Sequence, residues 1–290
     1  MNDPEHERSI CVGIDGSNAA IHAAQWAATE ATARNVPLEL VHVIATDNDY
    51  GPLPIDIELE RPYAREILDA AKSAVTAGNE SVKVETEIIT GRLHPTLRYL
   101  SESAELLVVG SVGVSHIRQL LIGSTAVDLA HNALCPLVIV RAHREGSIPT
   151  TGPVVVAVDY SAANDAVFGF AAKEAAIRKS ELLAVHAWRL HLGIKSDEYH
   201  LSARAQEAQE LLDNRISKWQ RIFPDVRMDS LAVQANPAHY FEDLSNTAQI
   251  VVVGGRTDSS MHRRALGSVA NTLVHHSKCP VFVVPGKDNG

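Results

Sequence analysis

Cysteine and long apolar runs are both scarce in this sequence. Only three cysteines occur among 290 residues and no two form a CxxC pair, so neither a disulfide framework nor a cysteine metal site is indicated. No stretch approaches the roughly 18 apolar residues of a membrane span, and the start MNDPEHERS lacks the basic and apolar segments of a signal peptide. We therefore expect a cytoplasmic location, no membrane partner, and cysteines that pack as small buried side chains.

Basic residues are outnumbered by acidic ones. The formal net charge of −9 at pH 7 opposes binding to DNA, RNA and anionic membrane surfaces. We therefore expect no nucleic-acid partner, and any anionic ligand must be held by local geometry. With 46% hydrophobic and 21% charged residues, the composition is that of a globular protein. Its length suffices for two domains, each with a substantial core.

Several widespread functional signatures are absent. The sequence contains no Walker loop GxxxxGK[ST], no GxGxxG opening a helix, no HExxH and no GxSxG. Its histidines and carboxylates show no spacing that converges on a metal, so we predict no metal site, and we expect structural roles for the strand histidines His42 and His186. A phosphoryl-receiver domain is excluded because Asp15 stands alone after the first strand, Thr90-Gly91 ends the third, and Arg141 follows the fifth.

The chain is an internal repeat with a fixed spacing of 144 residues. The polar segment 141–153, broken by glycine and proline, separates the two copies and suits an exposed connector. We therefore predict domains at residues 1–145 and 151–290. The matched positions are Asp15 with Asp159, Glu30 with Glu174, Arg34 with Arg178, His42 with His186, Gly110 with Gly254, Gly123 with Gly267, Ser124 with Ser268, and Cys135-Pro136 with Cys279-Pro280.

Short apolar runs alternate with segments of helical period in each half, which predicts βαβ units in a parallel sheet. The predicted fold class is α/β, with two tandem doubly wound, Rossmann-like domains, each an open five-stranded parallel sheet with helices on both faces. In the first half, strands are expected at 10–14, 38–44, 82–89, 106–110 and 136–140, and helices at 18–35, 62–77, 95–104 and 124–133; 203–222 is the clearest helix of the second half. Ligands of such sheets bind where the strand order reverses, so Asp15 and Gly110 should face one crevice.

A glycine motif follows the fourth predicted strand. Gly110-Ser111-Val112-Gly113 is followed, after nine residues, by Gly123-Ser124. Gly110 and Gly113 lack a Cβ, which permits positive φ and a close approach of backbone amides to a ligand. Gly at a strand end and Gly-Ser before a helix are each common in turns and caps, but their joint spacing favours a binding loop.

The start of the helix after Gly123 is a predicted anion site. Its first N–H groups and the helix dipole attract negative charge, and Ser124 and Thr125 add hydroxyl donors. Arg118, inside the nine-residue gap, is placed to reach a phosphate. We therefore predict a nucleotide whose phosphates end at 123–125 and whose ribose or adenine meets Asp15.

These residues resemble the universal stress protein family, whose nucleotide-binding members carry GxxG, nine residues and G[ST]. Further similarity lies in the segments Val12–Ser17 and Val154–Ser161, in Val41-His42-Val43 and in the Cys-Pro pairs, so it covers nearly the whole chain twice and resembles the tandem-domain members of actinobacteria. The resemblance implies ATP binding, although Ala126 lacks the hydroxyl usual at its position. The residues implied for the first site are Ile14, Asp15, Val43, Val109, Gly110, Val112, Gly113, Gly123, Ser124, Thr125 and Ala126.

The second half carries a degenerate motif. Gly254-Gly255-Arg256-Thr257 is followed after nine residues by Gly267-Ser268, so Thr257 replaces the second glycine, and Tyr160 replaces the small residue after the strand-one aspartate. If Thr257 needs a positive φ, its strain costs about 1–3 kcal/mol, so we expect weaker binding in this half. The residues expected there are Val158, Asp159, Ala187, Val253, Gly254, Arg256, Gly267, Ser268 and Val269.

The leading hypothesis is a non-catalytic, ATP-binding regulatory protein of the stress response, with ATP alone or as its Mg²⁺ complex. No general base positioned for water can be identified, so rapid hydrolysis is not expected. Two alternatives stay open: a slow ATPase or nucleotidyl transferase, and an assembly module with a vestigial nucleotide site. The apolar strands Val138–Val140 and Phe282–Val284 suit edge-to-edge contact, and we predict a pseudo-dimer of the two halves and a homodimer of the chain.

Overall fold

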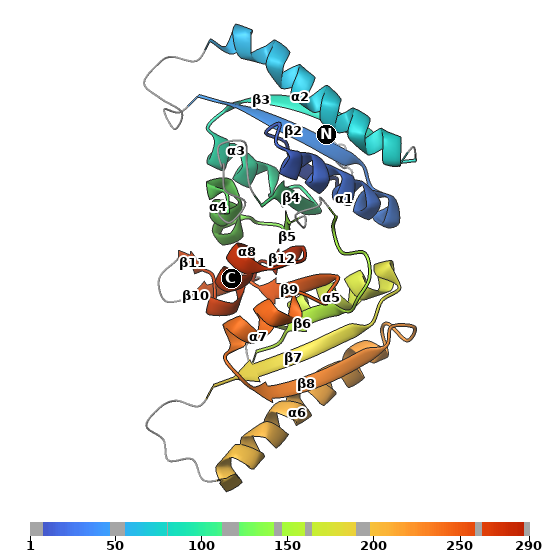
Figure 1. Cartoon of the computed structure of the whole chain (residues 1–290), viewed down its shortest axis with the longest axis vertical. Helices are drawn as coiled ribbons and strands as arrows, with labels where there is room; N and C mark the ends of the chain where they lie inside the picture. Colours follow the sequence, from blue (N-terminus) through green and yellow to red (C-terminus); the bar gives the residue numbers. More distant parts are fainter. Residues whose placement is uncertain are drawn as a thin grey trace, which may run out of the picture. The chain divides into compact units, whose positions relative to one another are not determined.

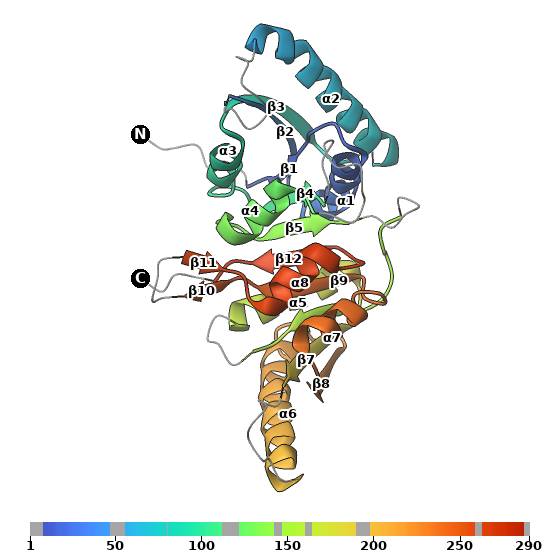
Figure 2. The ribbon, with the colours of Figure 1, turned by 60° about the vertical axis from the view of Figure 1, so that its left-hand side comes forward.

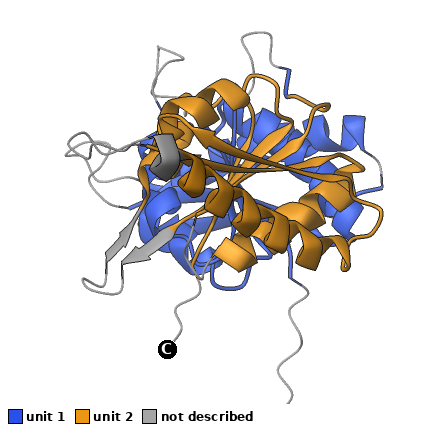
Figure 3. Ribbon diagram, turned by 90° about the horizontal axis from the view of Figure 1, so that it is seen from below, with its two compact units in different colours: residues 1–148 blue, residues 149–290 orange. Residues whose placement is uncertain are grey.

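The computed structural model describes residues 8–46, 56–79, 81–111, 122–141, 147–159, 164–189, 198–258 and 263–286. These residues form two compact units, 1–148 and 149–290, which Figure 3 colours separately. Each unit contains its own parallel sheet and its own helices. Across the described residues, no helix combines the length and apolarity that a membrane span requires.

The first unit has five parallel strands in the order β3-β2-β1-β4-β5. The strands are β1 (Ile10–Gly13), β2 (Leu38–Ala45), β3 (Val84–Gly91), β4 (Leu106–Gly110) and β5 (Leu137–Val140). The helices are α1 (Asn18–Arg34), α2 (Ile57–Gly78), α3 (Leu93–Leu100) and α4 (Ser124–Asn132). Helices α1 and α2 cover one face of the sheet, and α3 and α4 cover the other (Figure 2).

The second unit repeats this arrangement, with five parallel strands in the order β8-β7-β6-β9-β12. The strands are β6 (Val154–Ala157), β7 (Leu182–Trp188), β8 (Met228–Gln234), β9 (Ile250–Gly254) and β12 (Val281–Val284). The helices are α5 (Asn164–Arg178), α6 (Glu198–Gln220), α7 (Pro237–Leu244) and α8 (Ser268–His276). Helix α5 packs against α6, and α7 against α8 (Figure 1).

The predicted fold class is confirmed, and its physical basis is visible in the central strands. Every residue of β5 and the first four residues of β4 are buried, as expected for strands covered by helices on both faces. Helix α1 faces the sheet with alanines, and this small-residue surface lets the helix backbone approach the strands closely. In both units the first strand lies between the second and the fourth, so the strand order reverses there.

Several element bounds differ from the sequence prediction. Helix α6 begins at Glu198, five residues before its predicted start, α3 spans Leu93–Leu100 where 95–104 was predicted, and β3 spans Val84–Gly91 where 82–89 was predicted. Helix α2 begins at Ile57, five residues before the predicted start, because Asp56 caps it and Pro62 is accommodated inside the helix. A short antiparallel pair, β10 (Arg256–Asp258) and β11 (Arg263–Ala265), was not predicted; β10 starts within the first four residues of the second motif, and β11 lies in the gap that follows them.

All three cysteines are buried. Burial raises the pKa of the Cys135 thiol to about 12 and that of Cys279 to about 11. The pKa of Cys11 is also raised well above its usual value, first by burial and then by nearby carboxylates such as Glu39. The thiols therefore stay protonated at neutral pH and act as small apolar side chains.

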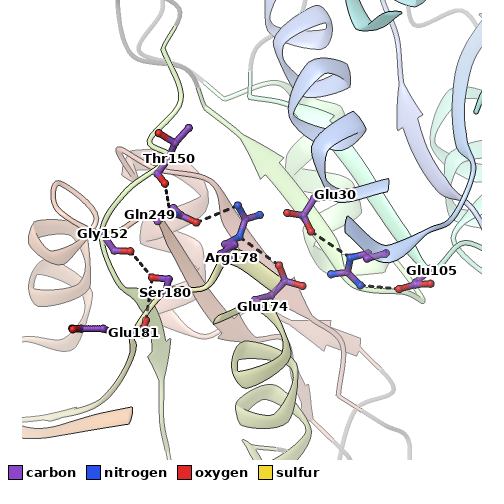
Figure 4. Close-up of polar contacts among 10 residues, drawn as sticks. Glu30, Glu105, Thr150, Gly152, Glu174, Arg178, Ser180, Glu181 and Gln249 are labelled. Atoms are coloured by element: carbon purple, nitrogen blue, oxygen red, sulfur yellow. Dashed lines mark hydrogen bonds and ion pairs between the residues drawn. The ribbon is translucent and has the colours of Figure 1, made fainter. Parts of the chain in front are cut away.

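The first helix of each unit carries an arginine whose side chain is largely buried. In the first unit Arg34 donates to Glu30 at 3.3 Å and to Glu105 at 2.7 Å (Figure 4). In the second unit Nε of Arg178 lies 3.7 Å from Glu174, one helical turn before it. In the first unit these contacts link the end of α1 to Glu105, the residue before β4.

Candidate functional site

The first site is built on the loop that leaves β1. Asp15 lies at the surface directly after the buried Ile14, and the backbone N–H of Ser17 donates to its Oδ1 at 2.9 Å. Gly16 has φ of 85°, and Ser17 caps α1 by accepting from the N–H of Ala20 at 3.1 Å. The turn therefore fixes both the start of α1 and the position of the Asp15 carboxylate.

Gly110 ends the neighbouring strand β4 and packs against the first turn of α1. A Cβ at this position would lie 2.7 Å from the Ala19 carbonyl carbon and 2.9 Å from the Ala20 nitrogen, far inside van der Waals contact. Its φ does not lie in the left-handed region. Gly110 therefore does not use the positive φ that glycine permits; a side chain is disfavoured here because the backbone of α1 lies against it.

The two ends of the glycine motif meet in the structure. The N–H of Gly123 donates to the carbonyl of Ser111 at 2.9 Å, which places the start of α4 beside the end of β4. Gly123 is the N-cap of α4, with φ of −69° and ψ of 146°, and it has no side chain to cap the helix. Ser124 is exposed and Thr125 is half-buried.

Some predicted residues do not contribute side chains, or lie outside the described part of the chain. Ala126 is buried in the core, so its methyl group packs inside the unit. Val43 is half-buried at the end of β2, whereas Val109 is buried within β4. Val112, Gly113 and Arg118 all lie outside the described residues.

In the second unit the site aspartate is held differently. Nδ2 of Asn164 donates to Oδ1 of Asp159 at 3.0 Å, and Nη1 of Arg215 donates to Oδ1 of Asn164 at 2.6 Å. Because a guanidinium only donates and a carboxylate only accepts, this amide orientation is the one that satisfies both neighbours. The repeat places Ala20 and Ala71 at the corresponding positions of the first unit, which therefore lacks this relay. Sequence reasoning missed it because nothing marks Asn164 and Arg215 as neighbours across two helices.

The remaining residues of the second site lie at positions equivalent to those of the first site. Val158 and Val253 are buried beside Ala187 and Gly254, which are half-buried, at the strand ends. Gly267 is the N-cap of α8, with φ of −64° and ψ of 160°, ahead of Ser268 and Val269. A Cβ on Gly254 would meet Val167 at 3.2 Å.

Thr257 lies in the strand β10, next to Arg256. An extended backbone suits a β-branched residue, so the expected strain at Thr257 does not arise. The second motif has instead become a short hairpin segment, in which Thr257 pairs with Arg264 and Arg256 pairs with Ala265.

Comparison with known proteins identifies the family. The profile of the universal stress protein family matches residues 7–141 and again residues 150–285. The chain belongs to the universal stress protein family.

Relatives agree with two universal stress domains in tandem, and a solved structure agrees with the fold. A universal stress protein of Mycobacterium tuberculosis is 34% identical over 96% of both chains, and one of Mycobacterium bovis is 33% identical over 98% of this chain and 99% of its own. The crystal structure of a universal stress protein from Archaeoglobus fulgidus covers 97% of both chains with a TM-score of 0.71 and 19% identity, which supports the fold.

The described residues of this universal stress protein contain no group of three histidine, cysteine, aspartate or glutamate side chains that could hold a metal ion. The chemistry available at the first site is that of one carboxylate, two hydroxyls and a helix start. Such a set suits a ligand with hydroxyl groups at one end and an anion at the other.

The close packing of Gly110 leads to a stability prediction. Gly110→Ala should lower the free energy of unfolding by about 1–3 kcal/mol without any ligand, because the methyl group must displace the backbone of α1. Urea unfolding followed by circular dichroism measures this, with Gly78→Ala as a control because a Cβ on Gly78 meets nothing within 4 Å. If Gly110→Ala is as stable as the parent, the glycine has another role.

Proposed function

We propose that the first unit binds an adenine nucleotide, with ATP as the preferred ligand, and that the protein acts as a regulator and not as an enzyme. The observation that carries this proposal is the bond from Gly123 to the Ser111 carbonyl, 2.9 Å long, which brings the uncapped start of α4 to the end of β4. Asp15 follows the adjacent strand β1. Donors for an anion, at the start of α4, and an acceptor for hydroxyl groups, on Asp15, therefore lie near the ends of neighbouring strands.

The residues fit the two ends of such a nucleotide. Backbone N–H groups at the start of α4 and the hydroxyls of Ser124 and Thr125 supply donors for phosphate oxygens. The Asp15 carboxylate supplies an acceptor for ribose hydroxyls or for the adenine amine. Any Mg²⁺ would arrive with the phosphates, as the counterion of ATP.

We further propose that the second unit binds the nucleotide more weakly. Thr257 carries a side chain where the first motif has Gly113, and Tyr160 stands at the position of Gly16. Both changes add bulk near the expected ligand. The predicted homodimer and the pseudo-dimer of the two halves remain predictions.

Two measurements test the proposed function. Protein purified without added ligand should release an adenine nucleotide on denaturation, and chromatography should give a ratio near one nucleotide per chain. After incubation with labelled ATP, intact ATP should be retained in stoichiometric amount. Steady release of phosphate would instead favour the slow ATPase, and no binding at millimolar nucleotide would remove the proposal and favour an assembly module.

A further inference from the structure

In both units a histidine on the second strand bonds to the carbonyl immediately before the site aspartate. Nδ1 of His42 lies 2.7 Å from the carbonyl oxygen of Ile14, and Nδ1 of His186 lies 2.7 Å from that of Val158. A carbonyl oxygen only accepts, so Nδ1 carries the proton and donates. The same contact occurs at two independent sites, which goes beyond the purely structural roles expected for these histidines from the sequence.

This hydrogen bond in the first unit lies at the point where β1 and β2 stop pairing. The N–H of Ile14 still donates to the Val41 carbonyl at 2.8 Å, but the pairing of β1 with β2 ends at Gly13 and Val41. In a continuing parallel ladder, the Ile14 carbonyl would accept from the next N–H on β2, that of Val43. The imidazole of His42 supplies the donor instead, so the strands can part here while the Ile14 carbonyl keeps a hydrogen bond.

The second unit has the same arrangement of hydrogen bonds. The N–H of Val158 donates to the Val185 carbonyl at 2.8 Å, and the pairing of β6 with β7 ends at Ala157 and Val185. His186 is buried, with 6% of its surface exposed, so its ring is held by packing as well as by the bond. The contact therefore belongs to the repeat and does not depend on the relay through Asn164.

We propose that His42 and His186 are positioning residues for the nucleotide sites of their units. Each ring fixes the peptide that carries the site aspartate, and thereby the direction in which that carboxylate leaves the strand. A rigid ring held in one position pre-organises the acceptor, which reduces the ordering cost of binding. The inference deepens the proposed function and depends on it.

The test measures ATP affinity by calorimetry on the full-length chain, in a Gly267→Asp background; a carboxylate at this N-cap of α8 should repel phosphate and so remove binding by the second unit. His42→Ala should weaken ATP binding about tenfold, the loss expected when the part-buried hydrogen bond to the Ile14 carbonyl loses its donor. The matched control is His131→Ala, since Nδ1 of His131 makes a similar bond, 2.8 Å long, to the Val127 carbonyl in the last turns of α4. That control should bind ATP like the background.

Two further variants distinguish the effect of the hydrogen-bond donor on ATP affinity from the effect of the volume of the ring. His42→Asn places an amide N–H where Nδ1 lies and should restore affinity to within about threefold of the background. His42→Phe keeps a ring but lacks the donor, and should bind as weakly as His42→Ala.

The inference is overturned if His42→Phe binds ATP like the background, if His42→Asn is as weak as His42→Ala, or if His131→Ala loses as much. These results differ from failure of the proposed function, in which the parent chain itself binds no adenine nucleotide. Thermal unfolding of each variant identifies any that does not fold, and His42→Asn and His42→Phe then decide the question.

Discussion

Arg34→Met is expected to lower the free energy of unfolding of the first unit by about 3–5 kcal/mol, the cost of removing one partner from a buried ion pair. The side chains of Arg34 and Glu30 are 3% and 2% exposed, and Nε of Arg34 lies 3.3 Å from Oε2 of Glu30. Methionine fills a similar volume, so the loss comes from the Glu30 carboxylate, which stays buried without its guanidinium. Chemical denaturation followed by circular dichroism and by the fluorescence of Trp26, on the same helix, measures this change.

The second unit supplies a matched control. Gln249 stands at the position of Glu105, and its amide oxygen accepts from Nη1 of Arg178 at 3.2 Å (Figure 4). A neutral amide can therefore fill this place, and Glu105→Gln should cost less than about 1 kcal/mol because the Glu105 side chain is 23% exposed. The buried partner of the arginine, Glu30, should therefore contribute more to the free energy of unfolding than the more exposed partner, Glu105.

The double variant Glu30→Leu with Arg34→Met completes this prediction. Replacing both members of a buried pair by apolar residues of similar size is often close to neutral, so it should recover most of the stability lost in Arg34→Met. If Arg34→Met alone costs less than about 1 kcal/mol, the pair contributes no more than an exposed ion pair, and this account of it is wrong.

The sequence predicted the sheets because their central strands, such as β4 and β5, are apolar on both faces, and it predicted the repeat because paired residues keep one spacing. It did not predict the start of α2, since Pro62 is an ordinary signal for a helix start but here lies within a helix capped by Asp56. The hairpin of β10 and β11 was missed because its strands are three residues long and carry arginines. Short polar strands give no alternation to detect.

At the candidate site, the sequence could predict where the motif residues lie, but it could not predict the contacts that they make with residues distant in the chain. The motif placed Gly110 and Gly123 at a strand end and a helix start, where the structure has them. The need for glycine at position 110 comes from the backbone of α1, which lies far earlier in the chain. The contact of His42 with the Ile14 carbonyl depends on strand pairing, so no local pattern could reveal it.

Gly123→Asp is expected to remove ATP binding by the first unit while leaving the fold as stable as before. Gly123 has the extended backbone of an N-cap residue, with φ of −69° and ψ of 146°. Aspartate is favoured there: it accepts from the first N–H groups of the helix and gains a few tenths of a kcal/mol over glycine. The same carboxylate occupies the donors proposed for phosphate and adds like charge, so ATP affinity should fall at least about thirtyfold, or ~2 kcal/mol.

Three comparisons make this prediction specific to phosphate. Gly123→Ser adds a neutral cap and should reduce affinity less than aspartate does. Adenosine has no phosphate, so the parent and the Gly123→Asp variant should bind it equally. Gly267→Asp should leave the first unit unaffected, because it changes only the start of α8.

Calorimetric titration with ATP and adenosine, together with thermal unfolding, separates the remaining hypotheses. Loss of ATP binding with unchanged adenosine binding and unchanged stability supports a phosphate site at the start of α4. Retention of ATP binding within about threefold would show that the phosphates lie elsewhere. If the variant loses ATP but keeps the oligomeric state of the parent by light scattering, nucleotide binding and assembly are separate properties of the chain, as the assembly-module hypothesis requires.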